Sequence, residues 1–126
     1  MKIQTIASAD APKAIGPYSP AVLAGGTLYC SGQLGMDPAS GELALGVKAQ
    51  AERAILNLKA LLSAAGLGLA DVVKTTIFLA SMADFAVVNE VYAANFAQPY
   101  PARSTIQVAG LPKGGLVEIE AVAVAH

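Results

Sequence analysis

The chain has 126 residues, is 55% hydrophobic and 13% charged, and carries a formal net charge of −1 at pH 7. That length predicts one domain over residues 1–126, built around a single core. The lysines are dispersed along the chain, which argues against a surface for nucleic acid or anionic lipid. The single cysteine cannot form an intrachain disulfide. With this one cysteine and a single histidine at the C-terminus, a histidine–cysteine metal site and a nucleophile activated by histidine are also not indicated.

The N-terminal segment lacks the apolar core of a signal peptide, and no apolar run approaches the roughly 20 residues that a membrane span needs. We therefore expect a soluble, cytoplasmic protein that binds no membrane. The sequence contains neither GxGxxG nor GxxxxGK(S/T), so phosphate-binding cofactor loops are not indicated. Any catalysis would have to use carboxylates, hydroxyls, amides and arginine.

The first part of the chain predicts three strands. A short strand is expected at "KIQT", residues 2–5. Gly25 and Gly26 then separate two runs of β-forming residues, which is typical of a two-residue hairpin because both glycines tolerate a positive φ. The two strands of this hairpin are expected at about 19–24 and 27–32.

A helix, a strand and a second helix are predicted in the middle of the chain. Over 47–65 the apolar residues recur at i, i+3 and i+4, the pattern of an amphipathic helix. The β-branched run "DVVKTTIFLAS" predicts a strand at 71–80. A helix at about 83–97 follows and is ended by the prolines of "PYP". The apolar residues near one side of this helix are Phe85, Val88, Tyr92 and Phe96.

The segments "ARSTIQVAG" and "LVEIEAVAVA" predict two final strands, at 102–110 and 116–125. The resulting order, β-β-β-α-β-α-β-β, indicates an α+β domain with a six-stranded sheet. Two helices can cover only one face of this sheet, yet strands 71–80 and 116–125 are largely apolar on both faces. We therefore expect copies of the chain to bury the second face in a closed symmetric oligomer.

Arg103, one of two arginines, falls in a predicted strand and shares a face with Thr105. In the last predicted strand, Glu118 and Glu120 share a face about 7 Å apart. If the two strands are neighbours, Arg103 can form an internal ion pair with either glutamate. Alternatively, its planar guanidinium can bind a ligand carboxylate, and a desolvated glutamate nearby would have a raised pKa suited to acid–base catalysis. The residues alone leave both alternatives open.

Several further positions could contact a ligand, although each also has an ordinary structural explanation. Tyr18 lies between two prolines that stiffen the backbone, but it could equally pack as a loop aromatic on the core. Ser31 and Gly32 end a strand, where glycine lets backbone N–H groups approach a ligand or where the chain simply turns. Asn89 on the second helix either lines a site or faces solvent. Cys30 is expected in the core as a small hydrophobe and not as a reactive thiol.

The order and spacing of several segments resemble those of a known family. The chain contains, in this order, "GPYSPAV", "YCSGQLGMDPASGEL", "NLKALLSAAG", "DVVKTTIFLASMADFAVVNEVYAANF", "PARSTIQV" and "VEIEAVAVA". Together they resemble the Rid (YjgF) superfamily, in particular its reactive intermediate deaminase A branch, over nearly the whole chain. The resemblance implies a chorismate-mutase-like α+β fold with two helices on one face of a six-stranded sheet. It also implies a homotrimer with a central barrel of sheets and ligand clefts between subunits.

The activity implied by this resemblance is the hydrolysis of reactive enamines and imines, such as 2-aminoacrylate, 2-iminopropanoate and 2-iminobutanoate, to 2-keto acids and ammonia, without a cofactor or metal. The resemblance implies that Arg103 holds the substrate carboxylate and that Glu120 positions or deprotonates the attacking water. The family's tyrosine corresponds to Tyr18. The remaining pocket positions of the family fall on Ser31, Gly32 and Asn89.

The chain departs from the family pattern at Thr105, where many members have cysteine. If this position acts through its backbone, replacing cysteine by threonine changes the site little. If its side chain touches the substrate, threonine adds a hydroxyl group and removes a thiol that could be modified. Two alternatives to an enzyme remain. One is a trimeric protein that binds 2-keto acids at Arg103 without turnover, and the other is a scaffold in which an Arg103–glutamate pair is only structural. RNA cleavage, also linked to Rid-like proteins, is not favoured by this acidic chain.

Overall fold

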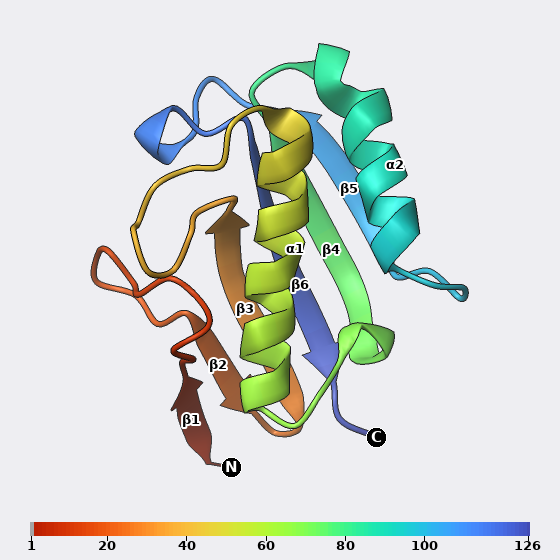
Figure 1. Ribbon diagram of the computed structural model, residues 1–126. Coiled ribbons are helices and arrows are strands. Elements are labelled where there is room, and N and C mark those ends of the chain that lie inside the picture. Colours follow the sequence, from red (N-terminus) through yellow and green to blue (C-terminus); the bar gives the residue numbers. More distant parts are fainter. Residues whose placement is uncertain (1) are drawn as a thin grey trace.

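Two α-helices lie side by side on one face of a six-stranded sheet in the computed structural model, which describes residues 2–126 (Figure 1). The strands are β1 (Ile3–Ile6), β2 (Ala21–Ala24), β3 (Thr27–Leu34), β4 (Val72–Leu79), β5 (Ala102–Gln107) and β6 (Val117–Val124), and the helices are α1 (Val47–Ala64) and α2 (Phe85–Asn95). The predicted α+β class, element order and element types are confirmed, with shifts of up to three residues at the element ends.

The strand order in the sheet is β1-β2-β3-β6-β4-β5. β4 and β5 are parallel because α2 crosses over between them, and all other neighbouring pairs are antiparallel. β6, the last strand in sequence, therefore lies inside the sheet between β3 and β4. As a consequence, β4 separates β6 from β5, and the two strands that carry the candidate glutamates and Arg103 are not neighbours.

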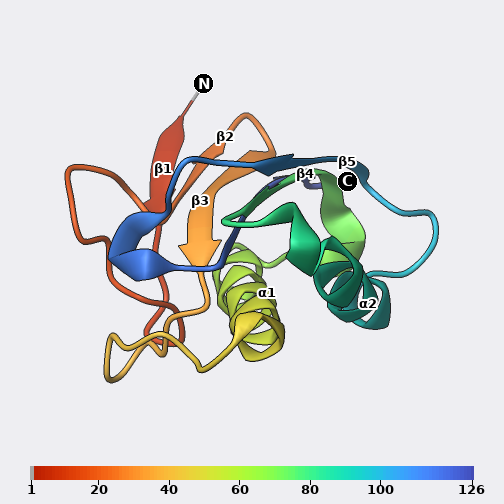
Figure 2. The ribbon, with the colours of Figure 1, turned by 90° about the horizontal axis from the view of Figure 1, so that it is seen from above.

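The two faces of the sheet differ in burial. Figure 2 shows both helices on the same side of the sheet. On that side the residues of β6 are at most 2% exposed, namely Val117, Ile119, Ala121 and Ala123. The opposite side is not covered by any helix of the described chain and leaves Tyr29 53% and Ile106 46% exposed. This is the uncovered face that the apolar patterning of the strands predicts.

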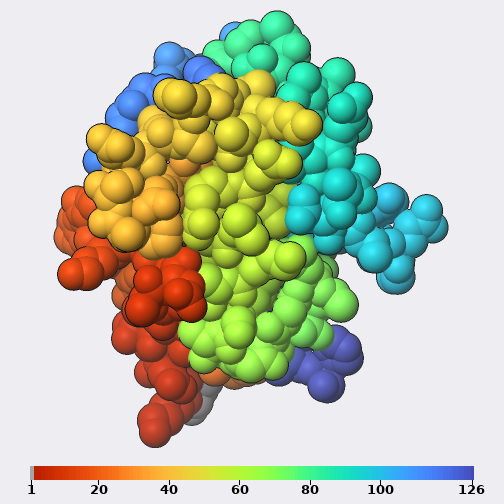
Figure 3. Space-filling model, in the orientation of Figure 1, coloured from red at the N-terminus to blue at the C-terminus, as the bar shows by residue number. Residues whose placement is uncertain are grey.

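The helix α1 packs its predicted apolar stripe onto the sheet and fills the centre of the helical face (Figure 3). The stripe also contains two buried polar residues that sequence analysis did not single out. Asn57 donates from Nδ2 to the carbonyl oxygens of Leu34 (3.1 Å) and Met36 (2.9 Å). Gln50 donates to the Ala44 carbonyl and accepts from the Leu116 N–H. Both side chains thus fix loops at one end of the sheet.

We expect Asn57→Ala to destabilise the protein by about 2–4 kcal/mol, because it leaves two buried carbonyl groups without a donor. Chemical denaturation at one fixed protein concentration measures this change. The control is Leu56→Ala on the same helix, since Leu56 is 47% exposed and should cost less than about 1 kcal/mol. Equal stability losses for the two variants would contradict the role of Asn57.

No helix among residues 2–126 is long and apolar enough to cross a membrane.

Candidate active site

Arg103 projects from β5 toward α2. Its register partner on β4, Thr75, is fully buried on the helical side of the sheet. The guanidinium carbon of Arg103 lies 4.8 Å from the ring centroid of Tyr92 and 5.8 Å from that of Phe85, within the range of cation–π attraction. Next to it opens a recess of about 310 Å³, hereafter the Arg103 recess. The recess is lined by Asn89, Tyr92, Ala93, Tyr100, Pro101 and Arg103.

The internal ion pair between Arg103 and Glu118 or Glu120 is excluded by the sheet. Across β4, Thr75 is paired with Arg103, whereas the next residue, Thr76, is paired with Glu120. Consecutive strand residues point to opposite faces, so the guanidinium and the two carboxylates lie on opposite sides of the sheet. The one salt bridge among residues 2–126 joins His126 and Asp71. Arg103 therefore has no carboxylate partner within the described chain.

Tyr18 lies in a second, smaller pocket of about 60 Å³, hereafter the Tyr18 pocket. Its lining includes Lys13, Ile15, Tyr18, Gly32, Met36 and Glu118. The Tyr18 side chain is 48% exposed, so it is not a core aromatic. Two hydrogen bonds attach its loop to β3, since Ser31 donates from Oγ to the Ser19 carbonyl (2.6 Å) and from its N–H to the Pro20 carbonyl (2.9 Å). The Ser31 hydroxyl therefore positions this loop.

Gly32 and Glu118 are in close contact inside the Tyr18 pocket. A Cβ atom at Gly32 would lie 2.6 Å from Oε2 of Glu118, so only glycine allows the carboxylate to take this place. Glu118 is only partly exposed. Burial, and to a lesser extent the negative charge of Glu120, raises the pKa of Glu118 above the usual value of a glutamate. A carboxyl group with a raised pKa is better suited to accept and return a proton than an ordinary glutamate.

Glu120 does not line either pocket. Glu120 is exposed and lies opposite a β-bulge. Cys30 of β3 pairs with Ala121 of β6, and Gln33 pairs with Ile119, so two residues of β3 lie opposite the single residue Glu120. The bulge consists of Ser31 and Gly32. The family resemblance implies a water-positioning role for Glu120, whereas within one chain it is Glu118 that lines the Tyr18 pocket.

Asn89 and Thr105 lie near Arg103 in different ways. Asn89 on α2 is exposed and lines the Arg103 recess. Thr105 points to the same side of β5 as Arg103, but its Oγ1 is buried without a hydrogen-bond partner among residues 2–126. Thr105 is not part of the recess lining. Its hydroxyl faces protein atoms within this chain.

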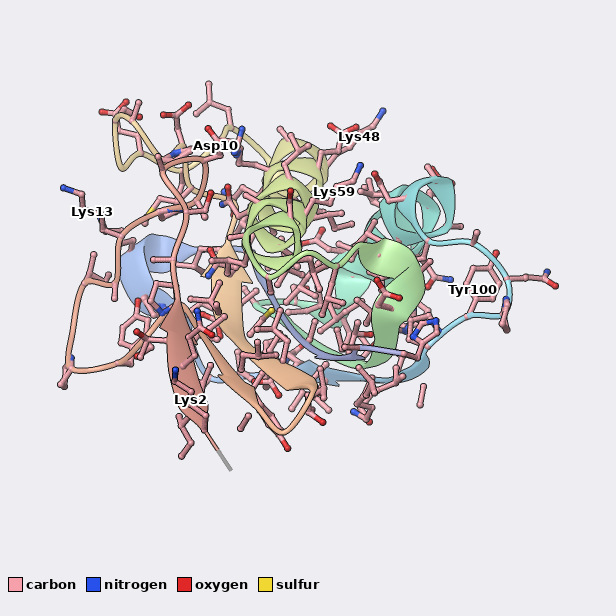
Figure 4. All side chains as sticks on the ribbon, turned by 90° about the horizontal axis from the view of Figure 1, so that it is seen from below. Lys2, Asp10, Lys13, Lys48, Lys59 and Tyr100 are labelled. Carbon is pink, nitrogen blue, oxygen red and sulfur yellow. The ribbon has the colours of Figure 1, made fainter. Side chains whose placement is uncertain are left out.

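The Arg103 recess and the Tyr18 pocket lie far apart in one chain. Figure 4 shows Lys13 of the Tyr18 pocket and Tyr100 of the Arg103 recess on opposite sides of the molecule. β6 and β4 lie between the strands that carry Gly32 and Arg103. The expected site residues thus form two groups, one around Arg103 and Asn89 and one around Tyr18 and Gly32.

The remaining titratable groups offer little other chemistry. Among the described residues, no group of three or more histidine, cysteine, aspartate or glutamate side chains could hold a metal ion. Cys30 is 6% exposed, and burial raises the pKa of its thiol to about 12. The expectation that Cys30 is an unreactive core residue agrees with both observations.

Comparison with known proteins identifies the family. Residues 8–125 match the family described as endoribonuclease L-PSP. The chain belongs to this family, the YjgF/Rid family. The predicted resemblance to the reactive intermediate deaminase A branch is confirmed by its relatives. A 2-iminobutanoate/2-iminopropanoate deaminase of Bos taurus is 56% identical over 120 residues, covering 94% of this chain and 88% of the relative. The human protein of the same name is 52% identical, covering 96% and 89%.

Solved structures of YjgF/Rid proteins share the fold of this chain. RidA from the Antarctic bacterium Psychrobacter sp. is 55% identical and superimposes with a TM-score of 0.95, covering 97% of this chain and 99% of that chain. E. coli TdcF with bound serine is 42% identical with a TM-score of 0.92, covering 98% and 99%. The coarse fold prediction, six strands and two helices, agrees with these structures.

Two residues of this YjgF/Rid chain were not recognised as part of a site from the sequence. Tyr92 was expected only as part of an apolar helix side, yet its ring also carries the guanidinium of Arg103. Glu118 was considered, together with Glu120, as an ion-pair partner of Arg103 or as a desolvated acid–base group, but it was not placed beside Tyr18 and Gly32. The signal that could have pointed to Glu118 was Gly32, because a glycine at a strand end indicates the close approach of another group. The sequence does not show which group approaches, since Glu118 is distant from Gly32 along the chain.

Proposed function

We propose that this protein is an enamine/imine deaminase that hydrolyses small 2-imino acids, such as 2-iminopropanoate and 2-iminobutanoate, to 2-keto acids and ammonia. The observation that carries the proposal is the half-buried, unpaired guanidinium of Arg103 beside an open recess. A planar, permanently charged fork is the preferred partner of a carboxylate, which all these substrates contain. The names of the bovine and human relatives support the substrate class, and serine bound to TdcF is also a small carboxylate.

In this proposal the active site forms between copies of the chain. Arg103 and Asn89 occupy one recess, and Tyr18, Gly32 and Glu118 occupy the other pocket, so neither alone contains both the Arg103 guanidinium and the Glu118 carboxylate. The uncovered sheet face, with Tyr29 and Ile106 half exposed, is the surface that would be buried between copies. We propose a closed homotrimer in which the Arg103 recess of one subunit faces the Tyr18 pocket of the next.

The proposed reaction needs one positioned water and one acid–base group. Arg103 binds the substrate carboxylate, and the Glu118 carboxylate takes a proton from water as the water oxygen bonds to the imine carbon. The C=N π electrons move to the nitrogen of the protonated imine, giving a neutral tetrahedral carbinolamine. Glu118 then returns its proton to this nitrogen, the C–N bond breaks, ammonia leaves, and the Glu118 carboxylate takes the hydroxyl proton as the C=O bond of the keto acid forms. Glu118 takes the role that sequence analysis gave to Glu120, and Tyr18 lines the same side of the site.

The direct test generates 2-aminoacrylate with a serine dehydratase and follows the ultraviolet absorbance of the enamine/imine mixture. We expect the signal to decay faster when the protein is added. A heat-denatured sample of the protein is the control for nonspecific effects. Equal decay rates with native protein, denatured protein and buffer would rule out the deaminase function. The result would then favour a protein that binds 2-keto acids without turnover.

A complementation experiment tests the shared site. Arg103→Ala and Glu118→Gln homo-oligomers should both be inactive, because each lacks one half of every site. When the two variants are unfolded together and refolded at equal amounts, we expect about a quarter of the wild-type activity, since each site draws Arg103 from one randomly chosen chain and Glu118 from the next. Mixing without unfolding is the control. No recovery after co-refolding would show that both residues act within one chain or in different functions.

A further inference from the structure

Tyr92 makes three contacts that together connect α2, β4 and β5. Its hydroxyl is hydrogen-bonded to the Thr75 hydroxyl at 2.9 Å, and both side chains are buried. Its ring stacks on Phe96 with 4.2 Å between centroids and 16° between planes. The Arg103 guanidinium carbon lies over the same ring at 4.8 Å. Tyr92 is therefore fixed at its hydroxyl end and through its ring, and it contacts the side chain that would bind substrate.

A long arginine side chain needs such a support to act as a precise clamp. Free arginine side chains lose much rotamer entropy when they are held in one conformation, which weakens binding unless the conformation is already selected. Among residues 2–126, Arg103 has no carboxylate partner that would hold its side chain in one conformation. The contacts that can hold the guanidinium beside the Arg103 recess are the aromatic rings of Phe85 and Tyr92 on α2. The ring of Tyr92 is the nearer of the two.

We propose that Tyr92 is a positioning residue, which holds the Arg103 guanidinium in the orientation that receives the substrate carboxylate and is itself held by Thr75 and Phe96. The assignment rests on the proposed carboxylate-binding role of Arg103. Tyr92 acts through Arg103, and its hydroxyl is occupied by Thr75. Burial raises the pKa of Tyr92, so the hydroxyl stays protonated and the hydrogen bond to Thr75 persists over the pH range of an enzyme assay.

The position of Arg103 can be observed without any activity, because the chain contains only one other arginine, Arg53. The Nε–H groups give two side-chain signals in a ¹⁵N–¹H correlation spectrum. Arg53 serves as an internal reference, since its Nε donates to Oδ1 of Asn57 at 3.0 Å, far from α2 in sequence. In the wild type, the Arg103 proton should be shifted upfield by the ring current of Tyr92. In Tyr92→Leu this shift should disappear, and in Tyr92→Phe it should be retained while the Arg53 signal stays unchanged.

The functional consequence is measured with pyruvate as the carboxylate probe and with imine hydrolysis kinetics. We expect Tyr92→Leu to weaken pyruvate binding and to raise KM about tenfold, the order expected for one partly desolvated cation–π contact, with a smaller change in kcat. Tyr92→Phe should stay within about threefold of the wild type. The matched control is Val91→Ala, which perturbs a neighbouring buried side chain of α2 and should lower stability without changing KM.

Each outcome decides a separate point. An Arg103 signal that is the same in Tyr92→Leu and wild type, or an unchanged KM, would overturn the positioning role. If Tyr92→Leu does not fold, Tyr92→Met replaces it, because methionine is long and flexible enough to fill the space of the ring but has no ring current. Tyr92→Met should lose the upfield shift of the Arg103 signal, and an unchanged shift would overturn the proposal. If wild-type protein neither binds pyruvate nor accelerates imine hydrolysis, the proposed function fails, while the spectra still decide whether Tyr92 holds Arg103.

Discussion

Arg103→Ala is expected to lower kcat/KM for 2-iminobutanoate hydrolysis by about 10²- to 10³-fold, since it removes a bidentate, charge-assisted contact to the substrate carboxylate. The expected effect on folding is small. Arg103 has no carboxylate partner among the described residues, so its removal leaves no buried charge unpaired. The protein should therefore remain folded, with some loss of packing against Tyr92. Steady-state kinetics and denaturation of the same samples measure both effects.

The other arginine provides the matched control. Arg53 donates from Nε and Nη2 to the Asn57 side chain on α1, at 3.0 and 2.8 Å, and lines neither pocket. Arg53→Ala should lower stability and leave kcat/KM close to the wild-type value. The opposite pattern, strong destabilisation by Arg103→Ala with normal activity, would support a scaffold in which Arg103 has only a structural role.

Glu118→Gln is expected to lower kcat by about 10²- to 10⁴-fold, the usual contribution of a general acid–base group, with little change in the affinity for substrate. Glutamine keeps the shape of the side chain but cannot take a proton from water. The matched control is Glu120→Gln, two residues away on the same face of β6, which removes an equal charge outside the Tyr18 pocket. If Glu120→Gln abolishes activity and Glu118→Gln does not, the assignment from the sequence is right. If both variants keep kcat, neither glutamate is the acid–base group of the reaction.

The pH dependence of kcat/KM gives an independent test of the Glu118 role. Burial first, and the charge of Glu120 second, raises the pKa of Glu118. The carboxylate form is the base, so kcat/KM should fall as pH decreases through this raised pKa. Glu120→Gln removes the repelling charge and therefore lowers the pKa of Glu118. We expect the acid limb to move to lower pH in this variant, and a shift to higher pH would contradict the assignment.

The raised pKa also predicts the stability of Glu118→Gln. The folded state binds the Glu118 proton more tightly than the unfolded state, so this group favours folding most at low pH. That contribution is lost as the pH rises through the raised pKa. Above this raised pKa, where the half-buried carboxylate is charged and costly, Glu118→Gln should therefore be at least as stable as the wild type. Denaturation at two pH values, one on each side of this range, measures the difference.

Local patterns were sufficient to predict the elements of the fold but not their neighbours in space. The period of apolar residues over 47–65 predicted α1 because a helix that packs on a sheet needs a continuous apolar stripe. The same pattern could not reveal the roles of Asn57 and Gln50, since the carbonyl groups that they contact lie in distant loops. Strand ends also differed, as for β5, which ends at Gln107, whereas the sequence predicted residue 110.

Side-chain alternation placed the candidate site residues on the right strands but could not relate the strands to one another. Glu118 and Glu120 share a face, as expected, but the ion pair with Arg103 assumed that β5 and β6 are neighbours. The insertion of β4 between them excludes the ion-pair alternative. The choice between the two glutamates depended on the bulge at Ser31 and Gly32 and on the loop of Tyr18, which are long-range features of the sheet.

The buried position of Cys30 has a practical consequence for handling and for the environments in which the protein can work. With a thiol pKa of about 12, about one molecule in 10⁵ carries the thiolate at pH 7, and the sulfur is shielded by the core. Position 105, next to the proposed clamp, contains a threonine and therefore no second sulfhydryl. Alkylating reagents and mild oxidants that inactivate thiol enzymes should leave Cys30 unmodified, and storage should require no reductant to protect it.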